Sequence, residues 1–147
     1  MAKKQLAPGT TALLSRVVRK SDLASDLAEE PPDAFPPVLA TAKMVGMMEL
    51  AAARVLIPLL EKGEMSVGVF MDVRHTAATP AGAKVITRAR FRGMEGKFYC
   101  FEVEAFDDGG PIGHAIHERA IVSADRLVEG ARKRCGRRPR KPHGRVG

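Results

Sequence analysis

The stretch that decides the fold is residues 41–60, TAKMVGMMELAAARVLIPLL. Its apolar side chains recur every three or four residues, which is the spacing of one face of an α-helix. The apolar positions that follow this spacing are Met44, Met48, Ala51, Ala52, Val55, Leu56 and Leu59. Since the stretch is apolar on nearly all sides, we expect a long helix that other elements surround.

The two ends of this helix carry their own signals. Thr41 is a candidate N-cap, because a threonine oxygen can accept a hydrogen bond from a free backbone N–H group of the first turn. Pro58 lacks a backbone donor and should distort the last turn. Gly63 is predicted to end the helix, since glycine readily adopts the conformation that follows a helical C-terminus.

Five segments around the helix alternate apolar and polar side chains, as β-strands do. They are residues 11–19, 65–75, 83–92, 97–106 and 111–122. Residues 20–37 contain four prolines and are predicted to form a loop. Arg88 and Arg90 of the third segment should face the acidic Glu102 and Glu104 of the fourth.

One long helix and strands without β-α-β alternation indicate an α+β fold with an antiparallel sheet. The simplest way to bury such a helix is to curl the sheet around it. The predicted architecture is therefore a hotdog fold, in which an antiparallel β-sheet wraps one central α-helix.

The chain has 147 residues and a net charge of +7, and the charge is unevenly distributed. Residues 131–147 hold eight of the 24 lysines and arginines and no acidic residue, so the first 130 residues are nearly neutral. We predict a domain over residues 1–130 and a basic, disordered tail over residues 131–147. The tail either only aids solubility or binds nucleic acid through phosphates, although no aromatic residue interrupts it for base stacking.

Other compositional features exclude several classes of protein. No apolar stretch reaches the length of about 18 residues that spans a bilayer, because Glu49 and Arg54 interrupt the longest one. The first residues lack the apolar core of a signal peptide. Cys100 and Cys135 show no metal-ligand spacing and are expected to be reduced thiols, which predicts a cytoplasmic protein without a metal site.

Glu49 lies in the middle of the apolar helix and is the first candidate for a functional residue. Burying its carboxylate unpaired would cost several kcal/mol or force it to bind a proton. It must therefore be hydrated, be paired with an arginine, or take part in chemistry. The candidate partners are Arg54, Arg74 and Arg119.

Thr41 and His75 could join Glu49 in a site, because a hydroxyl, a carboxylate and an imidazole supply a donor or nucleophile, a base and a proton carrier. Thr41 and Glu49 are about 12 Å apart along a helix axis, so a ligand lying along the helix would have to bridge them. Gly68 would let a substrate carbonyl approach a backbone N–H group. Each residue also has a structural alternative: a helix cap for Thr41, polar surface for His75 and a β-bulge for Gly68.

Several motifs stand in order along the chain: residues 35–41 (FPPVLAT), residues 44–49 (MVGMME), Gly68, residues 75–80 (HTAATP) and residues 117–120 (HERA). Together they resemble the fluoroacetyl-CoA thioesterase family of hotdog proteins. The resemblance runs in order over about residues 10–123. It implies a homodimeric thioesterase that hydrolyses a short-chain, fluoroacetyl-CoA-like acyl-CoA, with coenzyme A as part of the substrate and no separate cofactor.

The resemblance also implies roles for particular residues. The catalytic positions fall on Thr41, Glu49 and His75, and the substrate-binding positions fall on Gly68, Arg119 and Phe35. Pro32 and Leu39 stand where the fluoroacetyl-specific members have aromatic residues, which implies a less aromatic lid. Two other functions are compatible with the residues: a hotdog protein that binds an acyl thioester without cleaving it, and a nucleic-acid-associated protein that acts through the basic tail.

Overall fold

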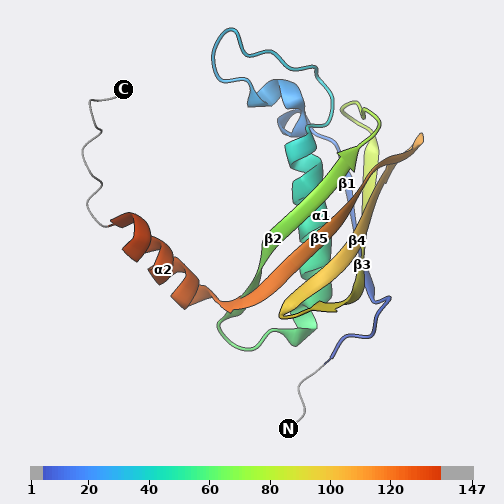
Figure 1. Ribbon diagram of the computed structural model, residues 1–147. Helices are drawn as coiled ribbons and strands as arrows, with labels where there is room; N and C mark the ends of the chain where they lie inside the picture. The colour runs from blue at the N-terminus through green and yellow to red at the C-terminus, as the bar shows by residue number, and fades with distance from the viewer. Residues whose placement is uncertain (1–4, 137–147) are drawn as a thin grey trace.

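The structure is a computed structural model that describes residues 5–136 (Figure 1). In chain order its elements are β1 (Thr11–Val17), the 3-10 turns η1 (Lys20–Asp22) and η2 (Ala24–Leu27), α1 (Thr41–Leu56), η3 (Ile57–Leu59), β2 (Glu64–His75), β3 (Lys84–Glu95), β4 (Phe98–Asp107), β5 (Gly110–Ser123) and α2 (Ala124–Gly136). The five predicted strands and the long helix are therefore confirmed, with end points that differ by a few residues.

The five strands form one antiparallel sheet in the order β1-β3-β4-β5-β2. Strands β3, β4 and β5 follow one another as hairpins, whereas β2 pairs with β5 at one edge of the sheet and β1 pairs with β3 at the other. Helix α1 lies across one face of this sheet (Figure 1). The predicted α+β class and the hotdog architecture are confirmed.

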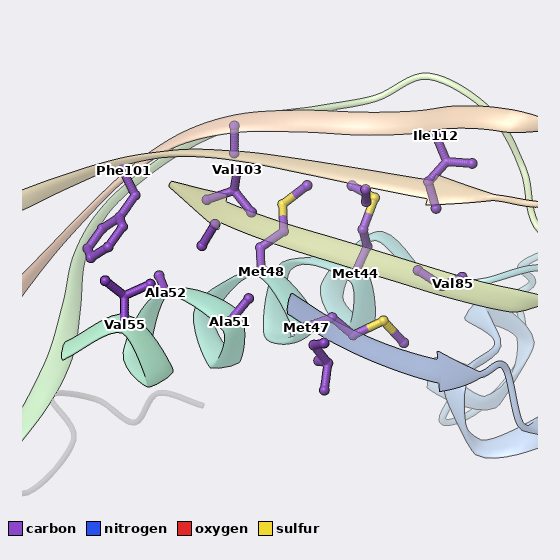
Figure 2. Packing of buried hydrophobic residues seen from close by; sticks show 14 of the residues in the cluster. Met44, Met47, Met48, Ala51, Ala52, Val55, Val85, Phe101, Val103 and Ile112 are labelled. Atoms are coloured by element: carbon purple, nitrogen blue, oxygen red, sulfur yellow. The ribbon is translucent and has the colours of Figure 1, made fainter. Parts of the chain in front are cut away.

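The core lies between α1 and the sheet (Figure 2). The helix contributes Met44, Met47, Met48, Ala51, Ala52 and Val55, and the strands contribute Val85, Phe101, Val103 and Ile112. The alanines let the helix backbone approach the sheet closely, and the flexible methionine side chains fill the irregular space beside them. The helical spacing seen in the sequence is thus the buried face of α1.

The outer face of the sheet carries the predicted charges. In β3 the inward residues are buried, and Arg88 and Arg90 point to the other side. Arg88 forms an ion pair with Glu104, and Arg90 forms one with Glu102, each across the β3–β4 ladder. The prediction of cross-strand charge pairs is confirmed.

The end of the long helix differs from the prediction. Regular α-helix stops at Leu56, and residues Ile57–Leu59 continue as a 3-10 turn around Pro58. Proline lacks the N–H group that would continue the α-helical ladder, so the chain tightens and then leaves the helix. Gly63, with a φ of 83°, instead serves the turn that leads into β2.

Strand β2 departs from simple alternation. Its pairing with β5 shifts register between Gly68 and Phe70. Val69, which lies at this shift, is 46% exposed. A bulge adds one residue to a strand and so changes the side on which the following side chains lie.

The C-terminal segment also differs from the sequence prediction. Residues 131–136, assigned to a disordered tail, form the last turns of α2, and residues 137–147 lie outside the described part of the chain. Helix α2 leads away from the sheet, beyond the side on which β2 lies (Figure 1). Within residues 5–136, no helix is long and apolar enough to cross a membrane.

Candidate active site

Thr41 and His75 meet at the N-terminal end of α1. The N-cap is Ala40 and no side chain caps the helix, so the interpretation of Thr41 as the cap is wrong. The hydroxyl is instead free to bond elsewhere, and Thr41 Oγ1 lies 2.8 Å from His75 Nδ1, across 34 residues of sequence. His75 is the last residue of β2, which places its ring at the rim of the sheet.

Backbone contacts hold these two residues together. Leu39, just before the helix, donates its N–H to the carbonyl of Thr79 (2.8 Å), and Ala40 donates to the carbonyl of Asp22 (2.9 Å). The buried Asp22 carboxylate accepts a hydrogen bond from Arg16 (2.9 Å). The segment entering α1 is therefore fixed against both the loop that follows His75 and the turn that follows β1.

An open groove of about 410 Å³ lies beside Thr41 and His75. Its remaining lining is formed by Ala24, Pro36, Val38, Leu39, Thr76, Ala77 and Ala78. Phe35, an implied substrate-binding residue, precedes the lining residue Pro36 and is 50% exposed. The groove is thus mainly aliphatic, with one hydroxyl–imidazole pair at its edge.

The surroundings of the His75 imidazole favour its neutral form. Partial burial lowers its pKa below the usual 6.5, and the nearby backbone of Ala77 opposes this only in part. The second ring nitrogen, Nε2, is buried and has no hydrogen-bond partner within the described residues. An uncharged imidazole at neutral pH can accept a proton from a hydroxyl or from water.

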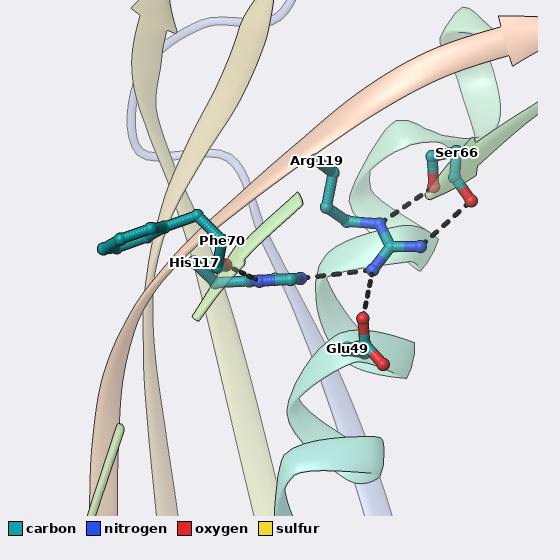
Figure 3. A network of polar contacts seen from close by, with 5 residues as sticks. All are labelled: Glu49, Ser66, Phe70, His117 and Arg119. Atoms are coloured by element: carbon teal, nitrogen blue, oxygen red, sulfur yellow. Dashed lines mark hydrogen bonds and ion pairs between the residues drawn. The ribbon is translucent and has the colours of Figure 1, made fainter. Parts of the chain in front are cut away.

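Glu49 lies in a second polar cluster, on the side of α1 that faces β2 and β5 (Figure 3). Its side chain is 44% exposed, and Oε2 accepts a hydrogen bond from Nη1 of Arg119 at 3.4 Å. Of the three candidate arginines, it is therefore Arg119 that pairs with the carboxylate. Nearly half of the Glu49 side-chain surface therefore remains accessible to another molecule.

Arg119 is held by several groups at once. Its side chain is 8% exposed, and it donates from Nε to Ser66 Oγ and from Nη2 to the Ser66 carbonyl, both at 3.0 Å. Burial lowers the pKa of the Arg119 guanidinium, and the Glu49 carboxylate opposes that shift. The guanidinium stays charged, because arginine titrates far above neutral pH. A buried cation fixed in this way fixes the position of the carboxylate beside it.

His117 belongs to the same cluster, and sequence reasoning did not assign it a role. Nη1 of Arg119 lies 3.1 Å from His117 Nε2, and His117 Nδ1 lies 2.7 Å from the carbonyl of Phe70. Since the guanidinium can only donate, Nε2 must accept, and Nδ1 carries the proton that is donated to Phe70. Burial lowers the pKa of His117, the hydrogen bond to the Phe70 carbonyl opposes this in part, and the charge of Arg119 adds to the lowering. This direction agrees with a neutral ring that accepts at Nε2. The shared face of His117 and Arg119 on β5 was the signal available in the sequence.

Gly68 makes room for the Glu49 carboxylate. A Cβ atom at this position would lie 2.2 Å from Glu49 Oε2 and 3.2 Å from His117 Cε1. The absence of a side chain therefore admits a group of the protein itself, whereas the sequence suggested space for a substrate carbonyl. The β-bulge alternative also holds, because the register shift follows Gly68 directly.

The two polar clusters stay apart within one chain. Thr41 and Glu49 both lie on α1, separated by eight residues or about 12 Å of helix, and no contact joins them in the described structure. The described residues also contain no group of three or more side chains that could hold a metal ion. The site thus offers a hydroxyl–imidazole pair beside a groove and a half-exposed carboxylate two turns further along the helix.

Comparison with known proteins points to one family. A sequence model of the family described as fluoroacetyl-CoA-specific thioesterase matches residues 18–125. The fluoroacetyl-CoA thioesterase of Streptantibioticus cattleyicolor is 44% identical over 93 residues, which is 63% of this chain and 67% of that protein.

Solved structures agree with this result. A crystal structure of a fluoroacetyl-CoA thioesterase superposes with a TM-score of 0.83 at 36% identity, covering 88% of this chain and 98% of the other. A thioesterase superfamily member from Thermus thermophilus gives a TM-score of 0.81 at 30% identity, covering 91% and 96%. A hot-dog-like protein from Thermanaerovibrio acidaminovorans gives 0.77 at 27% identity, covering 89% and 94%.

Proposed function

The chain belongs to the fluoroacetyl-CoA-specific thioesterase family, and on this premise we propose that it hydrolyses short-chain acyl-CoA thioesters. Water adds to the acyl carbon, the carbon–sulfur bond breaks, and a carboxylate and free coenzyme A leave. The observation that carries the proposal is the 2.8 Å contact between Thr41 Oγ1 and His75 Nδ1 beside an aliphatic groove. These two groups can hold and transfer protons next to a small acyl chain.

Thr41 and His75 act as a pair in this proposal. The neutral imidazole takes up a proton that is released by the attacking water and passes it to the departing thiolate of coenzyme A. The Thr41 hydroxyl donates a hydrogen bond to the carbonyl oxygen, where negative charge develops as the tetrahedral intermediate forms. Without the Thr41 hydroxyl, the developing negative charge would lose a hydrogen-bond donor. Without the His75 imidazole, the proton would lose its carrier.

Glu49 supplies the carboxylate that takes a proton from the attacking water. In the alternative covalent route it attacks the thioester carbon, expels the thiolate and forms a mixed anhydride, which water then hydrolyses to the carboxylate product. Arg119 is a positioning residue, because it orients the carboxylate from a buried site behind it. A substrate that lies along α1 would meet both clusters, since the helix connects them. The half-exposed carboxylate and the open groove are compatible with such a path.

Two substitutions test the assignment. Glu49→Gln and His75→Ala should each lower kcat/KM for acyl-CoA cleavage by about a hundredfold or more, as the loss of acid–base groups does. His114→Ala is the matched control, because His114 is exposed on the opposite face of the sheet. Release of the thiol of coenzyme A, followed with a thiol reagent, gives the rates. If both site variants cleave acyl-CoAs at the native rate, the proposal is wrong.

The same proposal extends to the choice of acyl group. Leu39 is buried in the groove wall, so aliphatic rather than aromatic surface meets the acyl chain. Such a pocket discriminates a single methylene by about 10- to 200-fold. We therefore expect acetyl-, fluoroacetyl- and propionyl-CoA all to be cleaved, with longer and aryl thioesters well below them. A rate panel over these thioesters decides the point, and a preference for aryl-CoA would contradict it.

We also propose that the active protein is a homodimer joined along β2. Strand β2 is an edge strand of 12 residues, so one side of its backbone has no partner strand among residues 5–136. Met65, Val69 and Phe70 expose 60%, 46% and 48% of their surface along it. A long edge strand with exposed apolar side chains tends to pair with another strand, and a second copy of β2 would supply the missing backbone hydrogen bonds. The β1 edge is shorter, at seven residues.

The dimer has a direct test. The native mass in solution should be twice the chain mass by light scattering coupled to size exclusion. Val69→Lys places a charge at the centre of the proposed seam and should shift the mass toward that of one chain, because an edge lysine disfavours strand pairing. Leu13→Lys, at the exposed β1 edge, is the control and should leave the dimer intact. A native protein with the mass of one chain would refute the dimer.

Two further parts of the proposal concern the location of the protein and its need for a cofactor. Cys100 and Cys135 are both free thiols, which supports a reducing compartment, and we place the protein in the cytoplasm. Hydrolysis needs only water and the thioester, so we propose no separate cofactor. Full activity after dialysis against a chelator would agree with this, and its loss would contradict it.

A further inference from the structure

Helix α2 has an apolar stripe that the described part of its own chain does not cover. Leu127, Val128, Ala131 and Cys135 fall on one side of the helix at 100° per residue, and none of them is buried. Leu127 and Val128 are 47% and 46% exposed. An isolated helix of 13 residues is only marginally stable in water. The exposed stripe therefore indicates that α2 packs against another surface.

The start of α2 is fixed at the seam of the proposed dimer. Ala124 donates its N–H to the Gly63 carbonyl at 3.0 Å, and Ser123 pairs with Glu64, the first residue of β2. Two copies of β2 related by a two-fold axis run antiparallel. The midpoint of β2 lies between Val69 and Phe70. If the two-fold axis passes through this midpoint, Glu64 of one copy lies opposite His75 of the other. Helix α2 then begins next to the Thr41–His75 groove of the second copy.

The direction and length of α2 would let it reach over a second copy paired at β2. Figure 1 shows the helix leading outward beyond β2, away from its own sheet. Its 13 residues span about 20 Å at 1.5 Å per residue. The second copy is thus the surface that the apolar stripe meets, because it adjoins β2 on the side toward which α2 runs.

The groove lacks a feature that its substrate requires. Coenzyme A carries a diphosphate and a 3′-phosphate, and protein sites usually bind such groups with arginine or lysine. None of the residues that line the Thr41–His75 groove is basic. On α2, Arg132 and Arg134 border the apolar stripe on its two sides, whereas Arg126 and Lys133 lie on the opposite side of the helix.

We propose that α2 of one copy packs its apolar stripe on the second copy, where Arg132 and Arg134 bind the phosphates of the acyl-CoA in that copy's Thr41–His75 groove. The inference rests on the proposed thioesterase function and on the β2 dimer. Each active site is then completed in trans. The basic character of this helix serves substrate binding, and the groove itself needs to recognise only the acyl end.

The test compares two double variants with equal loss of charge. One is Arg132→Ala with Arg134→Ala, and the control is Arg126→Ala with Lys133→Ala. Each is assayed with acetyl-CoA and with acetyl-pantetheine, which has the same thioester but no phosphate. The ratio of kcat/KM for acetyl-CoA to that for acetyl-pantetheine should fall about tenfold or more in the first variant, the effect of losing a charge-assisted hydrogen bond. It should stay at the native value in the control.

The outcomes separate this inference from the proposed function. If the native protein cleaves neither thioester, the thioesterase assignment fails. If it cleaves both and the first variant keeps the native ratio, or the control loses it equally, the assignment to Arg132 and Arg134 is overturned. Far-UV circular dichroism of both variants shows whether the helix content is equal, and alanine favours helix in each.

Mixed dimers test whether the helix acts in trans. In one mixed dimer, His75→Ala is in one chain and the Arg132→Ala, Arg134→Ala pair is in the other. In the second, all three changes are in one chain and the partner is native. The first mixed dimer should keep the native preference for acetyl-CoA, because the chain that retains His75 is paired with a chain that retains Arg132 and Arg134. The second mixed dimer should lose this preference, because the chain that retains His75 is paired with a chain that lacks both arginines. The reverse result would place α2 over its own groove and overturn the proposal.

Discussion

The substitution Gly68→Ala should displace the Glu49 carboxylate while leaving the stability of the fold nearly unchanged. The new methyl carbon would lie 2.2 Å from Glu49 Oε2, whereas ordinary van der Waals contact begins at 3.4 Å. The carboxylate oxygen must therefore move by about 1.2 Å. It ends a flexible, half-exposed side chain, so it can move without disturbing the backbone. Its 3.4 Å contact with Arg119 would change as a result.

The magnitude follows from that displacement. A misplacement of about 1 Å in a catalytic group costs about a hundredfold in rate, so kcat/KM should fall by about that factor. The free energy of unfolding should change by less than about 1 kcal/mol, because alanine is favoured over glycine inside a strand by about 0.5–1 kcal/mol and offsets the crowding. Activity and stability should thus respond very differently to one methyl group.

The assay pairs thiol release from acetyl-CoA with urea unfolding followed by circular dichroism. Gly130→Ala is the matched control, since nothing lies within 4 Å of a Cβ atom there and the residue is part of neither polar cluster. It should keep the native kcat/KM and slightly stabilise α2. A Gly68→Ala protein with native kcat/KM would refute the role given to the Glu49 position. Activity lost only in proportion to unfolded protein would refute it as well.

Three further predictions concern stability and pH. Gly113→Ala should destabilise the fold by about 1–3 kcal/mol in urea, because its Cβ would lie 2.7 Å from the backbone carbonyl of Arg74, which cannot move aside; an unchanged midpoint would contradict this. Burial lowers the pKa of His117 below 6.5, so the stability that it contributes is present above pH 6.5 and is lost as pH falls through the folded-state pKa. His117→Gln should therefore flatten the decline of the unfolding free energy between pH 7 and 5. The lowered pKa of His75 places the acid limb of the kcat/KM profile below pH 6.5, and a limb at or above that value would count against His75 as the base.

Much of the fold could be predicted because its signals are local. Helical spacing in residues 41–60 and alternation in the strand segments depend only on which side chains must leave water, and the core has that composition. The same logic predicted the Arg88–Glu104 and Arg90–Glu102 pairs. The bulge after Gly68 was only one of two alternatives, because a single glycine in a strand carries no information about which neighbour needs the space.

The candidate site could be predicted only as a set of residues. The motif resemblance named Thr41, Glu49 and His75, and residue types alone indicated acid–base chemistry. Which arginine pairs with Glu49 depends on how β5 lies across α1, since Arg119 is 70 residues away in the chain. The neutral state of His117 likewise depends on burial and on the guanidinium beside it, neither of which is visible in a linear pattern.

The sequence by itself determined the central helix, the antiparallel sheet and the family, because each depends on short-range spacing or on motifs in order. The tertiary structure decided how the residues work together. It placed the Thr41 hydroxyl against His75 instead of at a helix cap, and it placed the Glu49 carboxylate in the space that Gly68 leaves open. The physical reason is that hydrogen bonds and close contacts act over about 3 Å, and only folding brings groups from distant parts of the chain within that range.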